Sequence, residues 1–527
     1  MTKRYFMMAM LLAATTIAMG QDTFTNDQLT AVDDIDGTAR YVGMGGALGA
    51  LGADLSVISS NPAGIGLYRK SDIALTFGAV KPNNANGWDH TQPRSDGDKL
   101  ARASFDQIGL VWSLNTGAPK LKYVNFAFNY QKKANYNLGF YADNPTLGGL
   151  SQMDQVAELA NEGYDTDHNL AGLAYDAGYL EENEGYIYND FGGEESYYTR
   201  HQRGSLQAYD FNVSFNVNDR FYTGLTVGVD NVDYVSWSAY EEHNQNGYGE
   251  YRDYLLYNDR EIDGHGVNVK LGFIVRPIET SPFRIGLAIE TPTWYRLNTS
   301  TLYDLSNLID GTLSKPNPPE SYIETNVRTP WRARLSMGST VDKILAWGIE
   351  YEYANAAKTH MGYPKYDDDD WHNPYSSTAD KAMNHLTEDI MKGQHTLKLG
   401  LEVKPVESFA FRVGYNFVSS RYKDNPSFDQ YSLDSYSMDY QTSTDFTTLG
   451  AANIVTFGLG YKYKKFYADF AYKYRAQSAK FHAFDTSFTA QDGDFAADFL
   501  DLADATIEPV DIDLNRHQFL FSLGFKF

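Results

Sequence analysis

The stretch SFAFRVGYNF, residues 408–417, alternates large apolar side chains with small or polar ones at every second position. One face of an extended chain would carry Phe409, Phe411, Val413, Tyr415 and Phe417. Successive side chains of a β-strand point to opposite faces, so this pattern predicts a strand with one apolar face. Arg412 falls on the other face, among small and polar neighbours.

The same alternation recurs along the chain, for example in QAYDFNVSFNV at residues 207–217 and in QFLFSLGFKF at residues 518–527. Each such run is typical of a strand with one apolar and one polar face. The sequence predicts 14 strands, near residues 72–80, 104–115, 121–131, 207–217, 220–232, 264–276, 282–292, 330–341, 344–354, 395–404, 408–418, 452–464, 465–475 and 516–527.

The connections between these strands alternate between short and long. The long ones include residues 132–206, 293–329, 355–394, 419–451 and 476–515. A transmembrane β-barrel has short periplasmic turns, long extracellular loops and an even strand number. Closure of the sheet also pairs every backbone group, as hydrocarbon requires. We therefore expect an all-β fold, a transmembrane antiparallel barrel of 14 strands with both ends of the mature chain on the short-turn side.

Charged residues within the predicted strands support this assignment. A charge on the lipid-facing side of a barrel costs about 2–4 kcal/mol at the bilayer midplane. All of these charges fall on the polar face, which would line the lumen: Asp210, Lys398, Glu402, Arg412, Asp469 and Lys473.

The first 20 residues read as a secretory signal peptide. Lys3 and Arg4 precede a short apolar run, and a small-residue site follows at Ala18-Met19-Gly20. We expect cleavage near Gly20/Gln21 and residence in the outer membrane of a Gram-negative bacterium. The alternative, a transmembrane anchor, would need an apolar run of about 20 residues. The expected domains are residues 1–20 as signal peptide, 21–71 as an N-terminal segment and 72–527 as the barrel.

Composition excludes several classes of protein. The formal net charge of -24 lacks the basic footprint that nucleic-acid binding needs. An aromatic content of 15% argues against disorder. The motif GMGGALG lacks the third glycine of the dinucleotide fingerprint, and neither G-x-S-x-G nor H-E-x-x-H occurs. We expect neither an enzyme nor a cofactor.

The N-terminal segment is rich in glycine and ends in an Asn-Pro corner. It contains GMGGALGALGAD at residues 43–54 and SSNPAGIGLYRKSDIALTFG at residues 59–78. Glycine permits close backbone approach, as a plug in a crowded lumen requires. Pro62 disfavours helix at Asn61, so residues 61–64 form at least a corner, and the alternative is a corner that also acts as a gate.

These motifs resemble the N-terminal region of the FadL/TodX outer-membrane transporters, which carry fatty acids and aromatic hydrocarbons. The hairpin-like segments 395–417 and 453–475 resemble the same family. The resemblance implies that residues 21–71 form a hatch inside a 14-stranded barrel, and it implies these hatch or gate residues: Gly43, Gly45, Gly46, Asn61, Pro62, Ala63 and Gly64. It implies as partners a hydrophobic small molecule, outer-membrane lipid, lipopolysaccharide and the barrel-assembly machinery.

Two basic residues of the polar face are candidates for binding a ligand head group. Lys398 and Arg412 could each receive a carboxylate through charge-assisted hydrogen bonds. Pairing with neighbours such as Glu402 or Asp469 is the alternative. The acidic run Asp367, Asp368, Asp369 and Asp370 is a weak candidate for Ca²⁺, without the spacing of an EF-hand.

Helix-like patches interrupt the long connections at residues 151–161, 379–391 and 495–505. In the family, loop helices form the groove that first meets the ligand, but here the patches are acidic and only partly apolar. Two functions follow. The first is passive, hatch-gated uptake of hydrophobic or amphipathic small molecules. The alternative is a barrel that acts through its loops as an adhesin or interaction protein, with a polar-solute porin as a third candidate.

Overall fold

The computed structural model describes residues 21–31, 34–82, 102–161, 169–308, 319–342, 344–365, 377–424, 435, 439–485 and 507–527. The expected signal peptide, the acidic run at residues 367–370 and the helix-like patch at residues 495–505 lie outside them. Among the helices of the described residues, none is long and apolar enough to cross a membrane.

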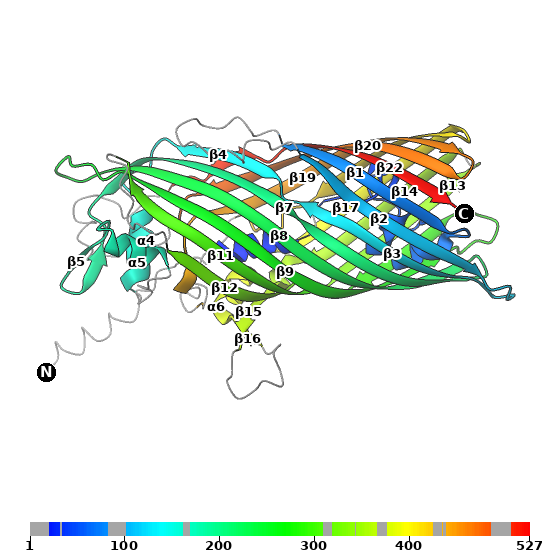
Figure 1. Cartoon of the computed structure of the whole chain (residues 1–527), viewed down its shortest axis with the longest axis horizontal. Coiled ribbons are helices and arrows are strands. Elements are labelled where there is room, and N and C mark those ends of the chain that lie inside the picture. The colour runs from blue at the N-terminus through cyan, green and yellow to red at the C-terminus, as the bar shows by residue number, and fades with distance from the viewer. Residues whose placement is uncertain are drawn as a thin grey trace.

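Within the described residues, one antiparallel sheet closes on itself as a 14-stranded barrel (Figure 1). The first strand, β1 (Asp72–Pro82), pairs with β2 (Arg102–Asn115) on one side and with the last strand, β22 (Arg516–Lys526), on the other. This pairing of the first strand with the last closes the barrel and confirms the predicted strand number.

Neighbouring strands follow the chain around the barrel. From β2 the order is β3 (Leu121–Asn135), β7 (Gly192–Val217), β8 (Phe221–Gln245), β9 (Tyr254–Val275), β10 (Arg284–Glu290) with β11 (Trp294–Asn307), β12 (Glu320–Arg328) with β13 (Arg332–Val341), β14 (Leu345–Asn355), β17 (Gly393–Val406), β18 (Phe409–Val418), β19 (Phe446–Tyr463) and β20 (Phe466–His482). The pairs β10/β11 and β12/β13 each occupy one strand position, because β10 and β11 both pair with β9, and β13 and β12 pair with β10 and β11 respectively.

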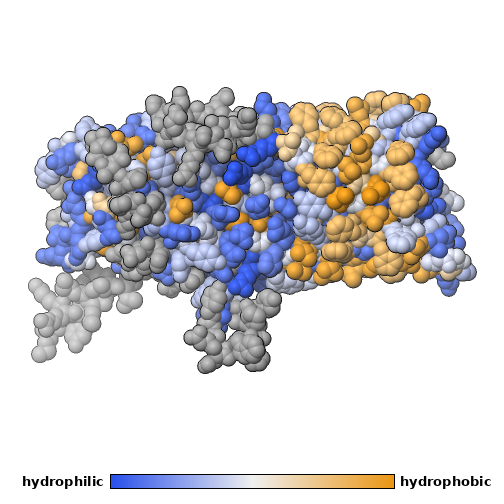
Figure 2. Space-filling view, in the orientation of Figure 1, coloured by the Kyte–Doolittle hydropathy of each residue, from blue (hydrophilic) through white to orange (hydrophobic). Residues whose placement is uncertain are grey.

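We call the end of the barrel with the short turns its lower end and the end with the long connections its upper end. The two faces of the wall match the sequence prediction over the lower half of the barrel. Phe411 is 52% exposed on the outside, whereas Arg412 is 8% exposed and points inward. On the face seen in Figure 2, the apolar residues form an orange band across the part of the barrel toward the short turns. This band has the chemistry of a lipid-facing surface.

Beyond the apolar band the alternation continues, but the polar residues now face outward and the apolar residues face inward. On β8 the outward residues change from Val229 to Asn231 and Asp233, and the inward residues change from Asp230 to Val232 and Tyr234. The strands therefore project beyond the band as a polar outer wall with a partly apolar interior. The sequence prediction ended β8 near residue 232, because it followed only the apolar outer face.

Smaller elements cover the long-connection end of the barrel. They are the helices α4 (Gln152–Asn161), α5 (Leu170–Asp176) and α6 (Lys381–Ile390), the 3-10 turn η3 (Ala356–Lys358), and the strands β4 (Leu138–Asn144), β5 (Glu181–Asn183), β6 (Tyr186–Tyr188), β15 (His360–Pro364), β16 (Ser377–Ala379) and β21 (Val510–Asp513). Helices α4 and α6 confirm the predicted patches at residues 151–161 and 379–391.

The chain before β1 runs down the inside of the barrel. It contains α2 (Gln21–Thr30), α3 (Ala39–Gly43) and the 3-10 turns η1 (Leu55–Ser59) and η2 (Pro62–Leu67). Phe24 of α2 packs against Tyr422 and Phe446 at the long-connection end, with ring centroids 5.8 and 4.8 Å away. The expectation that both chain ends lie on the short-turn side is thus wrong for the N-terminal end, because α2 buries an apolar residue among the loops.

Replacing Val413, which faces outward midway along β18, tests the assignment of the lipid face. We expect Val413→Arg to destabilise the membrane-inserted barrel by about 2–4 kcal/mol, because the charge enters hydrocarbon. Urea titration of folding into lipid vesicles measures this difference, with Val413→Leu as the control. Equal midpoints for the two variants would contradict the assignment.

Candidate functional site

Residues 39–67, here called the plug core, fold into three short capped turns inside the lumen. Thr38 caps α3 by accepting from the Tyr41 amide, and Asp54 caps η1 by accepting from the Ser56 amide. Asn61 caps η2 by accepting from the Ala63 amide, with Pro62 at the first helical position. The side chains that satisfy these amides come from within the segment itself, so its shape is locally encoded.

The plug core touches the barrel wall backbone to backbone. It faces inward glycines of the wall, here called the glycine row: Gly224, Gly272, Gly286, Gly338, Gly348, Gly400, Gly414 and Gly458. A Cβ built on Gly348 would lie 2.0 Å from the Ala47 carbonyl oxygen, and one on Gly400 would lie 2.3 Å from that of Met44. Side chains are excluded at these positions, so the glycine row sets how closely the plug core fits.

The predicted hatch residues all lie in the plug core, and all but Gly46 and Gly64 contact the barrel wall. A Cβ on Gly43 would lie 3.0 Å from the Gly458 Cα, and Gly45 and Gly46 hold positive φ angles of 61° and 72°. Asn61 donates to the Gly49 carbonyl at 2.9 Å. The Pro62 carbonyl accepts from Ser214 on β7 at 2.9 Å.

Residues 63 and 64 complete the corner before β1. Ala63 is fully buried against Tyr222 and Ile274 of the barrel wall. The Gly64 carbonyl accepts from the Ala53 amide at 3.0 Å, which ties the corner back to the plug core. The corner is therefore part of one packed unit, and its action as a gate remains a proposal.

The two residues proposed to bind a ligand head group, Lys398 and Arg412, lie in buried ion pairs next to the plug core. Lys398 Nζ lies 2.9 Å from Glu350 Oε1 and 3.3 Å from Glu352 Oε2. Arg412 contacts Glu402 and Asp469, each at 2.6 Å. Their charges are already compensated, which was the alternative that the sequence left open.

Residues 21–31 and 34–36, here called the strap, comprise α2 and the chain that leads from it toward the plug core. Asp27 pairs with Arg421 at 2.9 Å near the loops. Asp34 pairs with Lys473 at 2.9 Å and also with Arg516. Side chains alone anchor the strap at these points, in contrast to the backbone contacts of the plug core.

The two acidic residues at the lower end of the strap differ in their ionisation. Burial would raise the pKa of Asp34, but the charges of Arg516 and Lys473 outweigh it and hold that pKa well below its ordinary value. Burial and the nearby carboxylate of Asp106 raise the pKa of Asp36 to about 7. Asp34 therefore holds the strap through ion pairs, whereas Asp36 is held by hydrogen bonds such as the one from Gln518 at 3.1 Å.

Two cavities adjoin the strap. The upper cavity has a volume of about 110 Å³ and mixes apolar lining, such as Leu29, Ala134 and Tyr136, with the polar heads of Arg200 and Arg516. The lower cavity, of about 60 Å³, lies toward the plug core and is lined mainly by charged and polar residues, including Glu290, Arg332, Arg334, Glu352 and Lys398. Asp34 borders both cavities. Both cavities have some apolar surface, and the upper one has more of it.

An apolar patch on one side of the inner wall, here called the apolar ring, continues the upper cavity across the neighbouring strands from β3 to β12. It consists of Leu29 of the strap with Ala134, Tyr136, Leu206, Val232, Tyr234, Ile262, Tyr295, Leu297 and Val327. The Tyr136 hydroxyl donates to the Leu29 carbonyl at 2.5 Å. The ring arises from the reversed alternation of the upper strands, and in this structure Leu29 occupies it.

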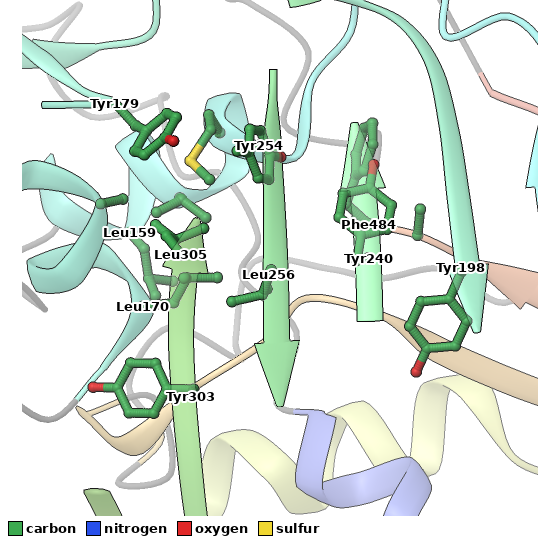
Figure 3. Packing of buried hydrophobic residues seen from close by; sticks show 14 of the residues in the cluster. Leu159, Leu170, Tyr179, Tyr198, Tyr240, Tyr254, Leu256, Tyr303, Leu305 and Phe484 are labelled. Carbon is green, nitrogen blue, oxygen red and sulfur yellow. The ribbon is translucent and has the colours of Figure 1, made fainter. Parts of the chain in front are cut away.

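The loop helices α4 and α5, here called the lid, cover the long-connection end of the barrel. Figure 3 shows Leu159 and Leu170 of the loop helices packed with Tyr254, Leu256 and Leu305 of the upper strands. Buried Glu242 accepts from Ser151 at 2.5 Å and from the Gln152 amide at 3.1 Å, at the start of α4. The predicted patch at residues 151–161 thus packs inward as a core.

The strands β2 and β3 separate beside the strap. Their pairing runs from Asn115↔Tyr123 to Gln107↔Gln131, and beyond it β2 pairs with β1 while β3 pairs with β7. Lys132 and Asp106 approach to 3.8 Å across this seam. Gln131 donates to the Asp36 carbonyl at 2.7 Å, so the seam contacts the strap directly.

These features define a plugged, lidded antiparallel barrel with an internal cavity. Its fold is that of a Pseudomonas aeruginosa FadL homologue, whose solved structure matches with a TM-score of 0.50 at 14% identity over 94% of this chain and 99% of that one. The P. putida toluene transporter TodX is similar as well, with a TM-score of 0.49 at 11% identity over 94% and 99%. No protein-family model and no curated protein sequence matches the chain.

Sequence reasoning missed the glycine row and the apolar ring. The signal for the first was present, because glycines recur on the polar face of the predicted strands, as at Gly400 and Gly414. A strand interior is an unfavourable place for glycine unless another backbone approaches closely. The signal for the second was the reversed alternation above residue 230.

Gly348→Val and Gly400→Val test the fit of the plug core. We expect each barrel to fold but to conduct ions, because the new side chain would displace the backbone of residues 44–47. Single-channel recording in planar bilayers measures the conductance, with Leu399→Ala on the outer face as the control. Deletion of residues 43–66 should open the pore, and adding Gly348→Val should not increase its conductance further. Closed channels in both valine variants would refute the close fit of the plug core against the glycine row.

Proposed function

We propose that this protein is an outer-membrane transporter for passive uptake of hydrophobic or amphipathic small molecules, either aromatic or fatty-acid-like. The upper cavity carries this proposal, because it places apolar surface inside a barrel whose lower lumen is filled with ion pairs. The FadL homologue and the toluene transporter TodX, which the chain resembles in fold, support the ligand class.

The size of the cavity indicates which ligands enter without rearrangement. An engineered apolar cavity of about 150 Å³ binds benzene, so the upper cavity, at about 110 Å³, is too small for toluene unless neighbouring groups move. A longer amphipathic acid needs the space that Leu29 takes in the apolar ring. Displacement of the strap would supply it.

The strap, rather than the plug core, is the element that we propose moves. Its anchors are side-chain pairs such as Asp27 with Arg421, which can be exchanged for contacts with a ligand. The plug core is held by backbone contacts with the glycine row, which have no alternative arrangement of similar packing. Exit through the seam between β2 and β3 then requires less rearrangement than exit past the plug core.

Filling the cavity tests this function. We expect Ala134→Phe to reduce binding of toluene and dodecanoate at least tenfold, because the new ring occupies the space that either ligand needs. Calorimetric titration of the purified barrel measures binding, and uptake by reconstituted vesicles measures transport. Val124→Phe introduces the same ring on the outer face of the same strand and should leave both unchanged.

A second candidate function is favoured by the lid. Because α4 and α5 pack as a core, the barrel could act through its outer surface with the lumen permanently closed. In that case neither ligand would bind to the wild type, and Ala134→Phe would bind as little as the wild type. That outcome would replace the transport proposal with the surface-interaction one.

A further inference from the structure

The short-turn end of the barrel carries a ring of basic residues in an otherwise acidic protein. The formal net charge of the chain is -24. At this end the basic residues, here called the basic ring, are Arg69, Lys70, Lys120, Lys122, Arg220, Arg276, Lys404, Lys462, Lys464, Lys465 and Lys526. The acidic residues of the same turns are fewer: Asp219, Glu279, Asp342 and Glu407.

Backbone hydrogen bonds between neighbouring turns place members of the ring side by side. The Lys526 amide donates to the Lys465 carbonyl at 2.9 Å, and the Arg276 amide donates to the Arg220 carbonyl at 2.7 Å. The Asn218 amide donates to the Lys120 carbonyl at 2.8 Å, which joins two further turns. The positive charge therefore follows the barrel rim.

Part of the ring is already paired. Arg69 contacts Asp219 at 2.9 Å, and Lys404 contacts Glu402 at 2.9 Å. Six other lysines of the basic ring make no ion pair with an acidic side chain of the described residues: Lys70, Lys120, Lys122, Lys462, Lys464 and Lys465. Most of these are exposed to solvent, so they are available to an anionic partner.

The ring lies where the apolar band ends. Tyr463 and Phe466 flank the Lys464-Lys465 turn on the outer face and are 58% and 62% exposed. Lys464 Nζ lies 5.2 Å from the centre of the Tyr463 ring. Figure 2 shows hydrophilic residues directly beyond the orange band at this end. A lysine that borders an aromatic girdle keeps its stem along apolar surface and its charge at headgroup level.

We propose that the basic ring binds the phosphate headgroups of anionic phospholipids in the leaflet on the short-turn side. A lipid fits better than a soluble anion, because the charges adjoin the apolar band without a gap and are spread around the rim. Each lysine near such a surface strengthens binding by a factor of about five at low salt. The inference uses the membrane orientation of the proposed function but not its transported ligand.

Lipid retention by the purified barrel tests this proposal. Native mass spectrometry would count phosphatidylglycerol and phosphatidylcholine retained from equimolar mixed micelles, with no transport ligand added. We expect the wild type to retain phosphatidylglycerol preferentially. In the variant K120Q/K462Q/K465Q the ratio of phosphatidylglycerol to phosphatidylcholine retained should be at least fivefold lower. K120R/K462R/K465R should keep it, because it preserves the charges.

The matched control removes three positive charges at the opposite end through K358Q/K392Q/K423Q and should behave as the wild type. Soluble glycerol phosphate should not displace the lipid. Equal retention of the two lipids by the wild type would overturn the proposal and leave an acidic soluble protein as the partner to seek. An equal loss in the control variant would overturn it as well. Because every arm uses folded barrel without transport ligand, these outcomes do not depend on whether uptake occurs.

Discussion

The closed lumen depends on a backbone contact that is possible only without side chains. Where Ala47 and Met44 pass the wall, their carbonyl oxygens lie against Gly348 and Gly400, and a methyl group on either glycine would overlap them. Registered pairing of Gly338 with Gly348, Gly348 with Gly400, and Gly400 with Gly414 extends this recess across four strands. The plug core therefore fits one position in the barrel, and the rest of the N-terminal segment is placed by it.

The reversal of the strand alternation determines where a ligand can lie. In the lower barrel the interior is polar and its charges pair with each other, as Lys398 does with Glu350. Above the apolar band, Leu206 and Val232 turn the interior apolar while the outside becomes polar. Apolar interior surface in contact with water is unfavourable. The lid and the strap cover this surface, and a hydrophobic ligand competes with Leu29 for it.

The sequence predicts the number and order of the strands because period-2 alternation is local and strong. It also predicts that Arg412 faces the lumen, since lipid excludes charge. The ends of the upper parts of β7, β8 and β9 could not be predicted in this way. Their apolar residues face inward instead of outward, so the outward-facing apolar pattern stops where the strands in fact continue. The ion partners of Lys398 depend on strand register, and the position of α2 depends on contacts made by Phe24 with distant loops. Neither leaves a local pattern in the sequence.

The central claim is that the strap moves while the plug core stays fixed. Hydrogen–deuterium exchange of the reconstituted barrel, with and without saturating toluene, measures both segments at once. We predict that toluene speeds exchange of amides in α2 and residues 34–36 and leaves residues 43–67 unchanged. Faster exchange in residues 43–67, or equal exchange throughout with toluene bound, would contradict it.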